Sequence, residues 1–424
     1  MSILSQQKQS QNADFPNIRP SLDLRFALAK KLDPRITFTR GSTGTYFGSD
    51  GLMRTAGVNE PRFDHDPITG QSLGLLIEES RTNYYTYSDI EGTVGGTPTG
   101  MSFAGGSPTG QTAVVSTDVS LGPNGQSAKH TRGVGSDNNV GYMYYGSHTL
   151  NTAYVASIYV YIPSSQAKNF SGKYITYQVE ATGASGIVYA DVTIVDRWQR
   201  IYVSYTPTSA TGIPVVLRTN AVAGSFFYTD CWQLEVGSFP TSYMPASGGS
   251  QFIRSPDLAS MEGANFSSWY NQSEGTIYIE TDKLYPGNFD AYRHFFAIDD
   301  GSSTNSISDY TLPSSTFITQ YGITNGGRQV FDYQQLNVGS SPVKYKIGHS
   351  LNSKYSFFTL STQRGTPQLS SKSAPNGQNL TLPTNMSRLF MGNVRNLNQI
   401  NSHIARLTYY PIQITNQQLI NLTS

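Results

Sequence analysis

The sequence predicts an all-β protein, built from tandem antiparallel β-sandwiches that follow a small N-terminal β-rich region. Short runs rich in Val, Ile, Thr, Tyr and Phe recur at roughly 8–12-residue spacing, with turn residues and no helical pattern between them. Charged residues make up only 13% of the chain, whereas Gly and Tyr number 40 and 28. A chain of 424 residues is too long for one ordinary core. We therefore expect three regions, comprising residues 1–88, 89–250 and 251–424.

The N-terminal region opens with a polar, Gln-rich stretch over residues 1–20. Such a stretch fits either a docking arm that orders on a partner or a disordered tail. The spacing of apolar residues predicts a short helix over 22–31, which Pro34 ends. The Thr- and aromatic-rich run TFTRGSTGTYF predicts a hairpin that ends in the turn cluster 48–51, and residues 73–77 read as a short buried strand.

The tripeptide Asp64-His65-Asp66 has the residue types of a metal or acid–base site, since carboxylate and imidazole are common ligands and proton carriers. Adjacent residues rarely point at one ion, so a hydrogen-bonded loop clasp is the favoured interpretation. Two arginines lie near this motif in the sequence. We expect Arg62 and Arg81 to pair with nearby acidic residues, namely Glu60, Glu78 or Glu79.

The whole segment from Thr37 to Asn83, which reads TFTRGSTGTYFGSDGLMRTAGVNEPRFDHDPITGQSLGLLIEESRTN, resembles a signature of bacteriophage virion proteins. Those proteins carry it near the N-terminus, ahead of β-sandwich modules that decorate the particle or touch the host surface. The resemblance implies a tail fibre, spike or head appendage. It also implies that residues 1–88 dock onto other virion proteins, and that the chain forms a homotrimer.

The middle region begins at a Gly- and Pro-rich run after Asp89. In AYVASIYVYIP, Ala156, Ile158, Val160 and Ile162 fall on one face of a strand, with Val155, Ser157, Tyr159 and Tyr161 on the other. Trp198 and Trp232 lie inside strand patterns, so both are expected in the core. Further strands are expected over residues 174–180, 186–195, 199–206, 213–219 and 225–236.

Two stretches of this region, DRWQRIYVSYTPT and FFYTDCWQLEVGSFPTSYMP, resemble carbohydrate-binding-module jelly rolls. The resemblance implies glycan binding, and it implies that Asp230 helps to hold a structural calcium ion. One aspartate cannot supply the roughly 6–8 oxygen ligands that calcium takes. No other cofactor is expected.

Residues 246–268 read as a linker to the last region. There GTIYIETDKLY alternates, with Ile277 and Ile279 on one face. The chain closes with a strand and a helix over 417–422 that Thr415 caps. This last region resembles concanavalin A-like and laminin-G-like sandwiches, which implies a lectin-like fold.

Sugars are held by aromatic faces and planar polar groups on loops. The densest cluster of such residues comprises Asp137, Asn138, Asn139, Tyr142, Tyr144 and Tyr145, followed by Trp269 and Tyr270. The commoner meaning of such a pattern is a strand whose tyrosines pack against neighbouring strands or against another subunit. Both interpretations stand at the level of sequence.

Enzyme signatures are weak, so no enzymatic activity is expected. Glu280-Thr281-Asp282 approaches the strand motif of sandwich glycanases, but no second glutamate follows at Pro286. The six histidines show no metal-ligand spacing.

Other partner classes are also disfavoured. Basic and acidic residues number 10 and 9 in residues 1–88, 7 and 9 in 89–250, and 12 and 10 in 251–424. This balance argues against nucleic acid as a partner. No membrane span is expected, and Cys231, the single cysteine, excludes an intrachain disulfide and is expected in the core.

Together these observations predict a virion surface protein for host attachment, made in the host cytoplasm, that binds a host glycan or polysaccharide. A capsid or tail decoration protein without receptor binding is the first alternative. A virion-associated polysaccharide depolymerase, with a site assembled across distant loops or subunits, is the second.

Overall fold

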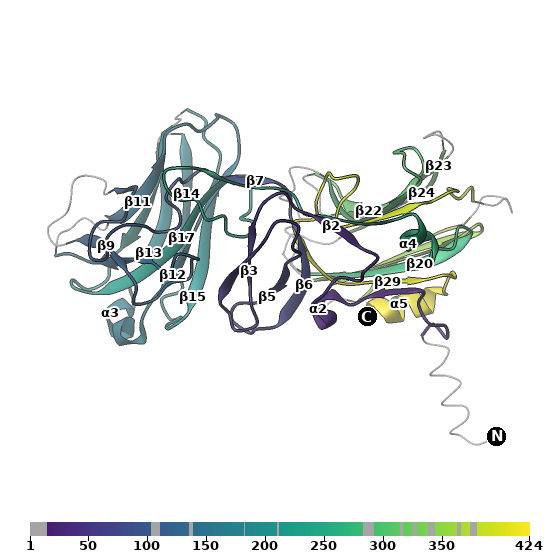
Figure 1. Ribbon diagram of the computed structural model, residues 1–424, viewed down its shortest axis with the longest axis horizontal. Coiled ribbons are helices and arrows are strands. Elements are labelled where there is room, and N and C mark those ends of the chain that lie inside the picture. The colour runs from purple at the N-terminus through teal and green to yellow at the C-terminus, as the bar shows by residue number, and fades with distance from the viewer. Residues whose placement is uncertain are drawn as a thin grey trace, which may run out of the picture.

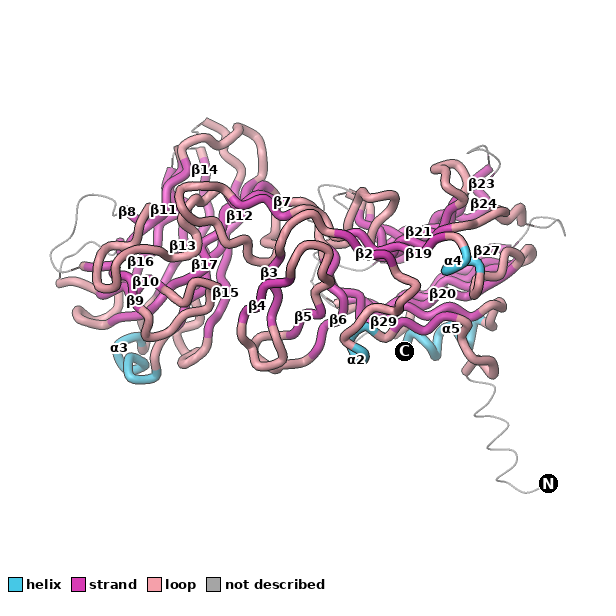
Figure 2. Tube along the Cα trace, viewed as in Figure 1, coloured by secondary structure: helices cyan, strands magenta, loops and turns pink. Residues whose placement is uncertain are grey.

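The computed structural model describes residues 15–102, 111–134, 139–181, 183–209, 212–282, 292–313, 317–324, 329–337, 344–362, 366–373 and 380–424. Within these residues the protein is an all-β molecule of two antiparallel sandwiches, as the sequence predicted. Figure 1 shows the sandwiches as two lobes along the long axis, with a small hairpin between them. Figure 2 shows how few helices accompany the strands.

The terminal sandwich contains two large sheets. Its eight-stranded sheet has the order β27 (Gln368–Ser373), β26 (Tyr355–Thr362), β25 (Tyr345–Asn352), β20 (Glu274–Thr281), β29 (Ser402–Tyr410), β6 (Ser72–Ile77) and β5 (Phe63–His65), with β1 (Leu22–Leu24) also paired to β29. Its seven-stranded sheet has the order β2 (Thr37–Thr39), β19 (Leu258–Glu262), β28 (Arg388–Met391), β21 (Arg293–Asp299), β22 (Ser306–Thr311), β23 (Phe317–Thr324) and β24 (Gln329–Asn337).

The insert sandwich contains two five-stranded sheets. The junction sheet has the order β15 (Trp198–Tyr205), β12 (Tyr154–Tyr161), β17 (Phe226–Val236), β10 (Ser127–Thr131) and β9 (Thr112–Ser116). The outer sheet has the order β14 (Ala184–Tyr189), β13 (Ile175–Ala181), β16 (Ile213–Thr219), β11 (Asn139–Tyr145) and β8 (Met101–Ser102).

Short elements complete the chain. β3 (Gly44–Phe47) and β4 (Met53–Ala56) form the hairpin between the lobes, and β7 (Arg81–Asn83) pairs with β18 (Phe252–Arg254). The helical elements are α2 (Phe26–Ala29), η1 (Ser164–Gln166), α3 (Ala167–Phe170), α4 (Ala264–Ser267) and α5 (Asn416–Thr423). The Thr415 hydroxyl accepts a hydrogen bond from the Gln418 amide and so caps α5, as the sequence predicted.

The strand pairing corrects the expected division of the chain. β1 pairs with β29, β2 with β19, and β6 with β29, so the N-terminal region is part of the terminal sandwich and not a separate docking module. The expected linker over 246–268 contains β18, β19 and α4. The expected helix over 22–31 is β1 followed by the single turn α2. Long-range pairing overrides local propensity here, because these short segments complete the edges of sheets.

The chain enters the insert sandwich through β7 and returns to the terminal sandwich through β18, and these two strands pair with each other. Ala156, Ile158, Val160 and Ile162 of the β12 segment face the insert core, as expected from the alternation. The opposite face of β12 is also buried, because Tyr159 packs with Cys231 and Tyr243 against Phe47 of the hairpin. Cys231 is buried, in agreement with its expected core position.

Candidate functional site

The outward face of the outer sheet carries polar and aromatic side chains in cross-strand rows. Ile175, Tyr177 and Val179 of β13 point into the insert core, so the alternate residues of this strand point outward. The strand register then aligns two rows. They are Tyr189, Thr176, Arg218, Asn139 in one row and Ile187, Gln178, Val216, Tyr142, Ser102 in the next. Thr176, Asn139 and Val216 are buried, so the exposed part of the face comes from the longer side chains around them.

A polar network runs along this face. Arg218 donates to both carboxylate oxygens of Glu180, from Nε at 2.5 Å and from a terminal guanidinium nitrogen at 2.8 Å. The Gln178 amide donates to the same carboxylate at 2.6 Å. Because Arg218 neutralises Glu180, the face presents planar polar groups with no net charge. All three side chains are partly exposed.

Aromatic side chains flank this network. Tyr189 is 60% exposed at the edge strand β14, and its ring packs edge-on against Tyr174 at 6.4 Å. Tyr142 lies in the neighbouring row on β11 and is partly exposed. Flat aromatic rings beside guanidinium, carboxylate and amide groups match the C–H faces and hydroxyl groups of a sugar ring.

The expected tyrosine cluster is only partly assembled here. Tyr142 belongs to the face, and Asn139 is buried in the same row as Arg218. Tyr145 instead packs inside the sandwich end, against Tyr84 at 5.0 Å and His148 at 5.1 Å. Asp137, Asn138 and the Tyr144 side chain lie outside the described residues.

Trp269 lies in the core, which corrects its expected role in a glycan surface, whereas Tyr270 is half-buried and its role stays a prediction. Trp269 is 4% exposed and belongs to the core of the terminal sandwich, where its indole N–H donates to the Asn265 carbonyl. Tyr270 packs on the same core and stacks on Tyr409 at 5.3 Å. Both rings pack against Phe266 of α4, and Tyr270 also lines a small pocket with Tyr409.

Sequence reasoning missed Gln178, Glu180, Arg218 and Tyr189. The available signal was the alternation within the expected strand 174–180, in which Thr, Gln and Glu occupy one face. Nothing local linked that strand to Arg218, since the sheet pairing brings the two together.

The Asp64-His65-Asp66 motif forms a hydrogen-bonded clasp, as favoured from the sequence. Asp64 Oδ1 accepts from the Phe47 and His65 amides, and His65 Nδ1 lies 3.0 Å from the Phe47 carbonyl. Asp66 accepts from the amides of Ile68 and Thr69, and so caps its own turn. The three side chains therefore make hydrogen bonds to the chain, and Asp64 Oδ2 also lies 2.9 Å from His403 Nε2.

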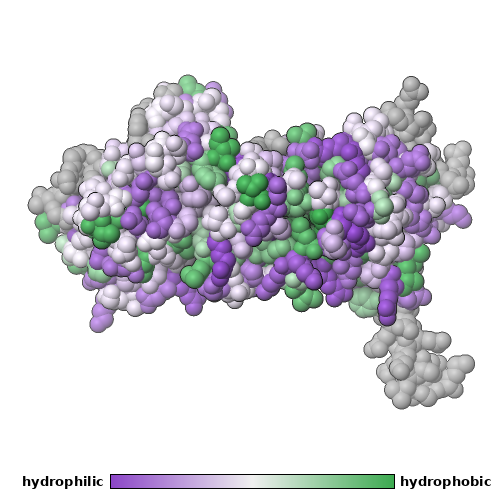
Figure 3. Space-filling view, viewed as in Figure 1, coloured by the Kyte–Doolittle hydropathy of each residue, from purple (hydrophilic) through white to green (hydrophobic). Residues whose placement is uncertain are grey.

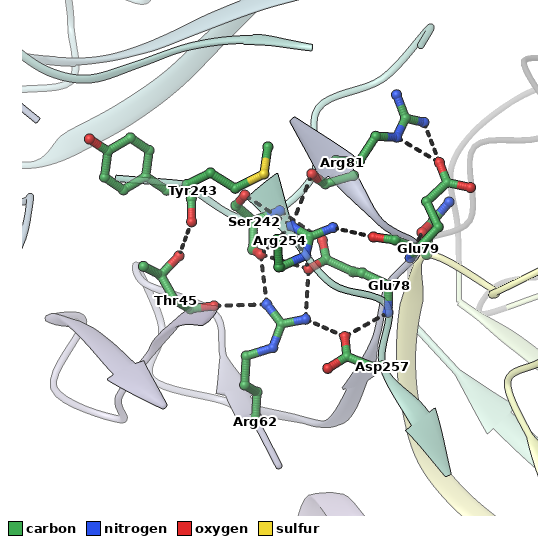
Figure 4. Close-up of polar contacts among 12 residues, drawn as sticks. Thr45, Arg62, Glu78, Glu79, Arg81, Ser242, Tyr243, Arg254 and Asp257 are labelled. Atoms are coloured by element: carbon green, nitrogen blue, oxygen red, sulfur yellow. Dashed lines mark hydrogen bonds and ion pairs between the residues drawn. The ribbon is translucent and has the colours of Figure 1, made fainter. Parts of the chain in front are cut away.

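Some of the charged residues of the signature segment meet at the junction of the two sandwiches. Figure 4 shows Arg62 between Thr45, Ser242, Glu78 and Asp257. Arg62 pairs with Glu78 at 2.8 Å and also with Asp257, and Arg40 reaches Asp257 at 3.0 Å. Arg81 pairs with Glu79 at 2.6 Å. The expected pairs of Arg62 and Arg81 are confirmed, whereas Glu60 binds the Gly57 amide.

This buried network joins segments that are far apart in the sequence. Arg254 lies 3.2 Å from Glu78, and Ser242 of the insert exit loop donates to Glu78 from its amide at 2.7 Å. Burial alone would raise the pKa of Glu78, but the charges of Arg254 and Arg62 hold it far below its ordinary value. Every carboxylate in the network has a cationic partner, so the network is an ionic lock that joins the two sandwiches.

Asp230 lies in a buried acidic pair with Asp89. Its Oδ2 accepts from the Leu121 and Gly122 amides, both at 2.8 Å, and its Oδ1 accepts from the Cys231 amide. Asp89 is buried, and its Oδ1 has no hydrogen-bond partner among the described residues. Burial raises the pKa of Asp89 to about 7, with the charge of Asp230 adding to the effect, and burial raises that of Asp230 to about 6.

A cation between these groups would neutralise both carboxylates, and the sequence did not suggest that Asp89 lies beside Asp230. The described residues hold no group of three or more His, Cys, Asp or Glu side chains suited to a metal. Within the described part of the chain, no helix has the length and hydropathy to cross a membrane.

The fold and the two rows of side chains define an all-β protein of two sandwiches, one of which presents a polar and aromatic sheet face. No known protein-family profile matches the chain. No curated protein matches it either.

Several solved structures match part of the chain. The Ruminococcus gnavus IT-sialidase CBM40 bound to α2,6-sialyllactose matches 38% of this chain and 88% of its own, at 11% identity and a TM-score of 0.29. The leech intramolecular trans-sialidase matches 38% of this chain and 24% of its own, at 11% identity and a TM-score of 0.30. The receptor-binding domain of a botulinum neurotoxin mosaic serotype C/D matches 39% of each chain, at 9% identity and a TM-score of 0.28. Similarity at this level defines no ligand for this chain.

Proposed function

We propose that the protein binds glycans through the outward face of its outer sheet. The observation that carries the proposal is the Gln178, Glu180 and Arg218 network between Tyr142 and Tyr189. A sugar ring laid across the strands would place C–H groups on the tyrosines. Its hydroxyl groups would then exchange hydrogen bonds with the planar polar groups.

A glycan array probed with the purified protein tests this role. Tyr189→Ala and Arg218→Met should each abolish or strongly weaken the wild-type signal, since they remove an aromatic face and the central donor. Tyr355→Ala is the matched control, because Tyr355 is a 45% exposed tyrosine on the terminal sandwich. Array signals that both sheet-face variants leave unchanged would sink the proposal.

We further propose that the protein is a bacteriophage virion protein that presents this face to the host surface. The proposal rests on the signature segment from Thr37 to Asn83. Arg62, Glu78 and Arg81 of that segment are buried at the junction, whereas Asp50 and Arg54 at the hairpin turn are exposed and could meet other virion proteins. Mass spectrometry and immunogold microscopy of purified particles should find the protein at the particle surface.

Two other virion roles make different predictions. A decoration protein would be present on particles yet give no array signal. A depolymerase would release reducing ends from host polysaccharide, which an attachment protein leaves intact. Homotrimerisation stays a prediction, and light scattering tests it, since a mass near 46.4 kDa would identify a monomer.

A further inference from the structure

A cleft lies between the two sandwiches, beside the ionic lock. It has a volume of about 420 Å³ and is lined by three separate parts of the chain. The hairpin contributes Phe47 and Met53, and β15 of the insert sandwich contributes Trp198 and Arg200. Phe47, Met53 and Trp198 also pack together on the small core around Tyr159. One wall of the cleft is therefore apolar and aromatic.

The opposite wall belongs to the terminal sandwich and is polar. His403 of β29 lies between two carboxylates, with Nε2 at 2.9 Å from Asp64 and Nδ1 at 3.7 Å from Asp282. Both His403 and Asp64 keep a small exposed area in the cleft. This arrangement fixes the imidazole ring at the cleft surface, because it is held from both sides.

Two residues that line the cleft each carry a buried polar atom without a hydrogen-bond partner among the described residues. Asn401 Oδ1 accepts from the Glu79 amide, which leaves Nδ2 as a donor without an acceptor. His65 Nδ1 faces a carbonyl oxygen, which can only accept, so Nε2 of the neutral ring is an acceptor without a donor. Such groups are costly when they are left unpaired.

The cleft therefore mixes groups that only donate with groups that only accept. Arg200 donates, whereas Asp64, Asp66 and Asp282 accept. An anionic ligand would meet these carboxylates, and a cationic ligand would meet Arg200. A hydroxyl group can both donate and accept, so a neutral polyhydroxylated ligand fits both sets.

We infer that this junction cleft is a second ligand site, distinct from the sheet face, which takes one or two rings of a neutral saccharide. Its volume falls within the roughly 300–1,000 Å³ range of ligand pockets. The aromatic wall with Trp198 supplies the stacking surface, and the His403 wall supplies the hydrogen bonds. A ligand held there touches both sandwiches at once.

Fluorine NMR of the full chain labelled with 5-fluorotryptophan tests the site directly. The chain has three tryptophans, of which Trp232 and Trp269 are 0% and 4% exposed in the two cores. Trp198 alone lines the cleft, and the sheet face holds no tryptophan. Millimolar neutral trisaccharides of glucose, galactose or N-acetylglucosamine are the probes, with sialyllactose as the anionic control. Trp198→Phe assigns the resonance.

At least one neutral trisaccharide should shift the Trp198 resonance and leave the other two in place. The same shift should persist in Arg218→Met, which is altered only on the sheet face. By calorimetry, Trp198→Leu should weaken that binding about tenfold, whereas Trp198→Phe, which keeps a flat ring, should weaken it less.

Three outcomes would overturn the inference. They are no shift with any neutral probe, a shift with sialyllactose alone, and loss of the shift in Arg218→Met. The last outcome would assign all binding to the sheet face, and so leaves the proposed function standing. Conversely, a Trp198 shift together with array signals unchanged in the sheet-face variants would reject the sheet face as a glycan site and leave the cleft as the binding site.

Discussion

Arg62 shows at the scale of one residue how the signature segment works. Its guanidinium is fully buried and touches Glu78, Asp257, Thr45 and Ser242. Burial would lower the pKa of Arg62, but Asp257 and Glu78 raise it above its ordinary value, so the group stays charged. Its role is to satisfy carboxylates that have no access to water.

Arg62→Met should therefore destabilise the protein by about 3–5 kcal/mol, because it leaves buried carboxylates without their cation. Urea denaturation of both proteins measures the loss. Arg54→Met is the control, since Arg54 forms an exposed ion pair with Asp50 and should cost at most about 1 kcal/mol. Equal losses for the two variants would show that the network contributes little.

The buried pair Asp89 and Asp230 predicts a pH dependence. Both pKa values are raised from 3.8 in the folded state, to about 7 and about 6. Because the folded state holds these protons more tightly than the unfolded state, the free energy of unfolding is highest below pH ~4. It falls as pH rises through ~6–7. Each pKa unit corresponds to about 1.4 kcal/mol.

We propose that calcium reverses this loss by neutralising the pair. Without calcium, the free energy of unfolding should fall between about pH 4 and 7, and millimolar calcium should restore it at pH 8. Asp89→Asn should flatten the profile and remove the calcium response, with thermal unfolding as the measurement. A calcium response that survives in Asp89→Asn would place the ion elsewhere.

At the scale of elements, the close approach of β6 to β29 depends on Gly74. Its φ is 108°, and a Cβ there would lie 2.2 Å from the Ile404 carbonyl oxygen. A side chain at this position would push apart the two strands that tie the N-terminal region to the terminal sandwich.

Gly74→Ala should cost more than Gly125→Ala. Gly125 has a φ of 74° with nothing within 4 Å of its Cβ position, so that variant isolates the cost of backbone strain, about 1–2 kcal/mol. The additional loss in Gly74→Ala measures the clash, which overpacking studies put at about 1–3 kcal/mol. Thermal unfolding of the two variants gives the comparison, and equal shifts would contradict the close approach.

Element types followed from local patterns in the insert sandwich. The strand expected over 213–219 coincides with β16, and the alternation in AYVASIYVYIP gives the inward face of β12 correctly. The burial of Tyr159 on the opposite face did not follow from local pattern, because it depends on a hairpin more than a hundred residues earlier in the chain. Trp198 likewise lines a cleft rather than the core.

At the scale of the whole molecule, the chain first contributes strands to the terminal sandwich, then forms the insert sandwich, and then completes the terminal sandwich. The face seen in Figure 3 carries small separate apolar patches over a mainly polar surface. The buried tyrosines fill intrachain clusters such as Tyr84 with Tyr154 and Tyr270 with Tyr409. These tyrosines are therefore used within one chain, and homotrimerisation stays a prediction.

This threading changes which fragments should fold. Residues 84–246 contain both sheets of the insert sandwich and should fold alone. Residues 251–424 lack β1, β2, β5 and β6, and should not reach a cooperative fold. Adding residues 15–83 through a short linker in place of the insert should restore folding. Circular dichroism and thermal unfolding compare the three fragments, and cooperative unfolding of 251–424 alone would contradict the pairing.

The sequence by itself determined the all-β class, most strands of the insert sandwich, the capped terminal helix and the pairs of Arg62 and Arg81. Each of these depends on residues near one another in the chain, where alternation and charge spacing act directly. Only the tertiary structure decided that residues 22–77 complete the terminal sandwich, that Arg218 meets Glu180, and that Trp198 faces His403 across a cleft. Those contacts come from strand pairing between distant segments. Many pairing registers are compatible with the local sequence, and the shared hydrophobic core selects one of them.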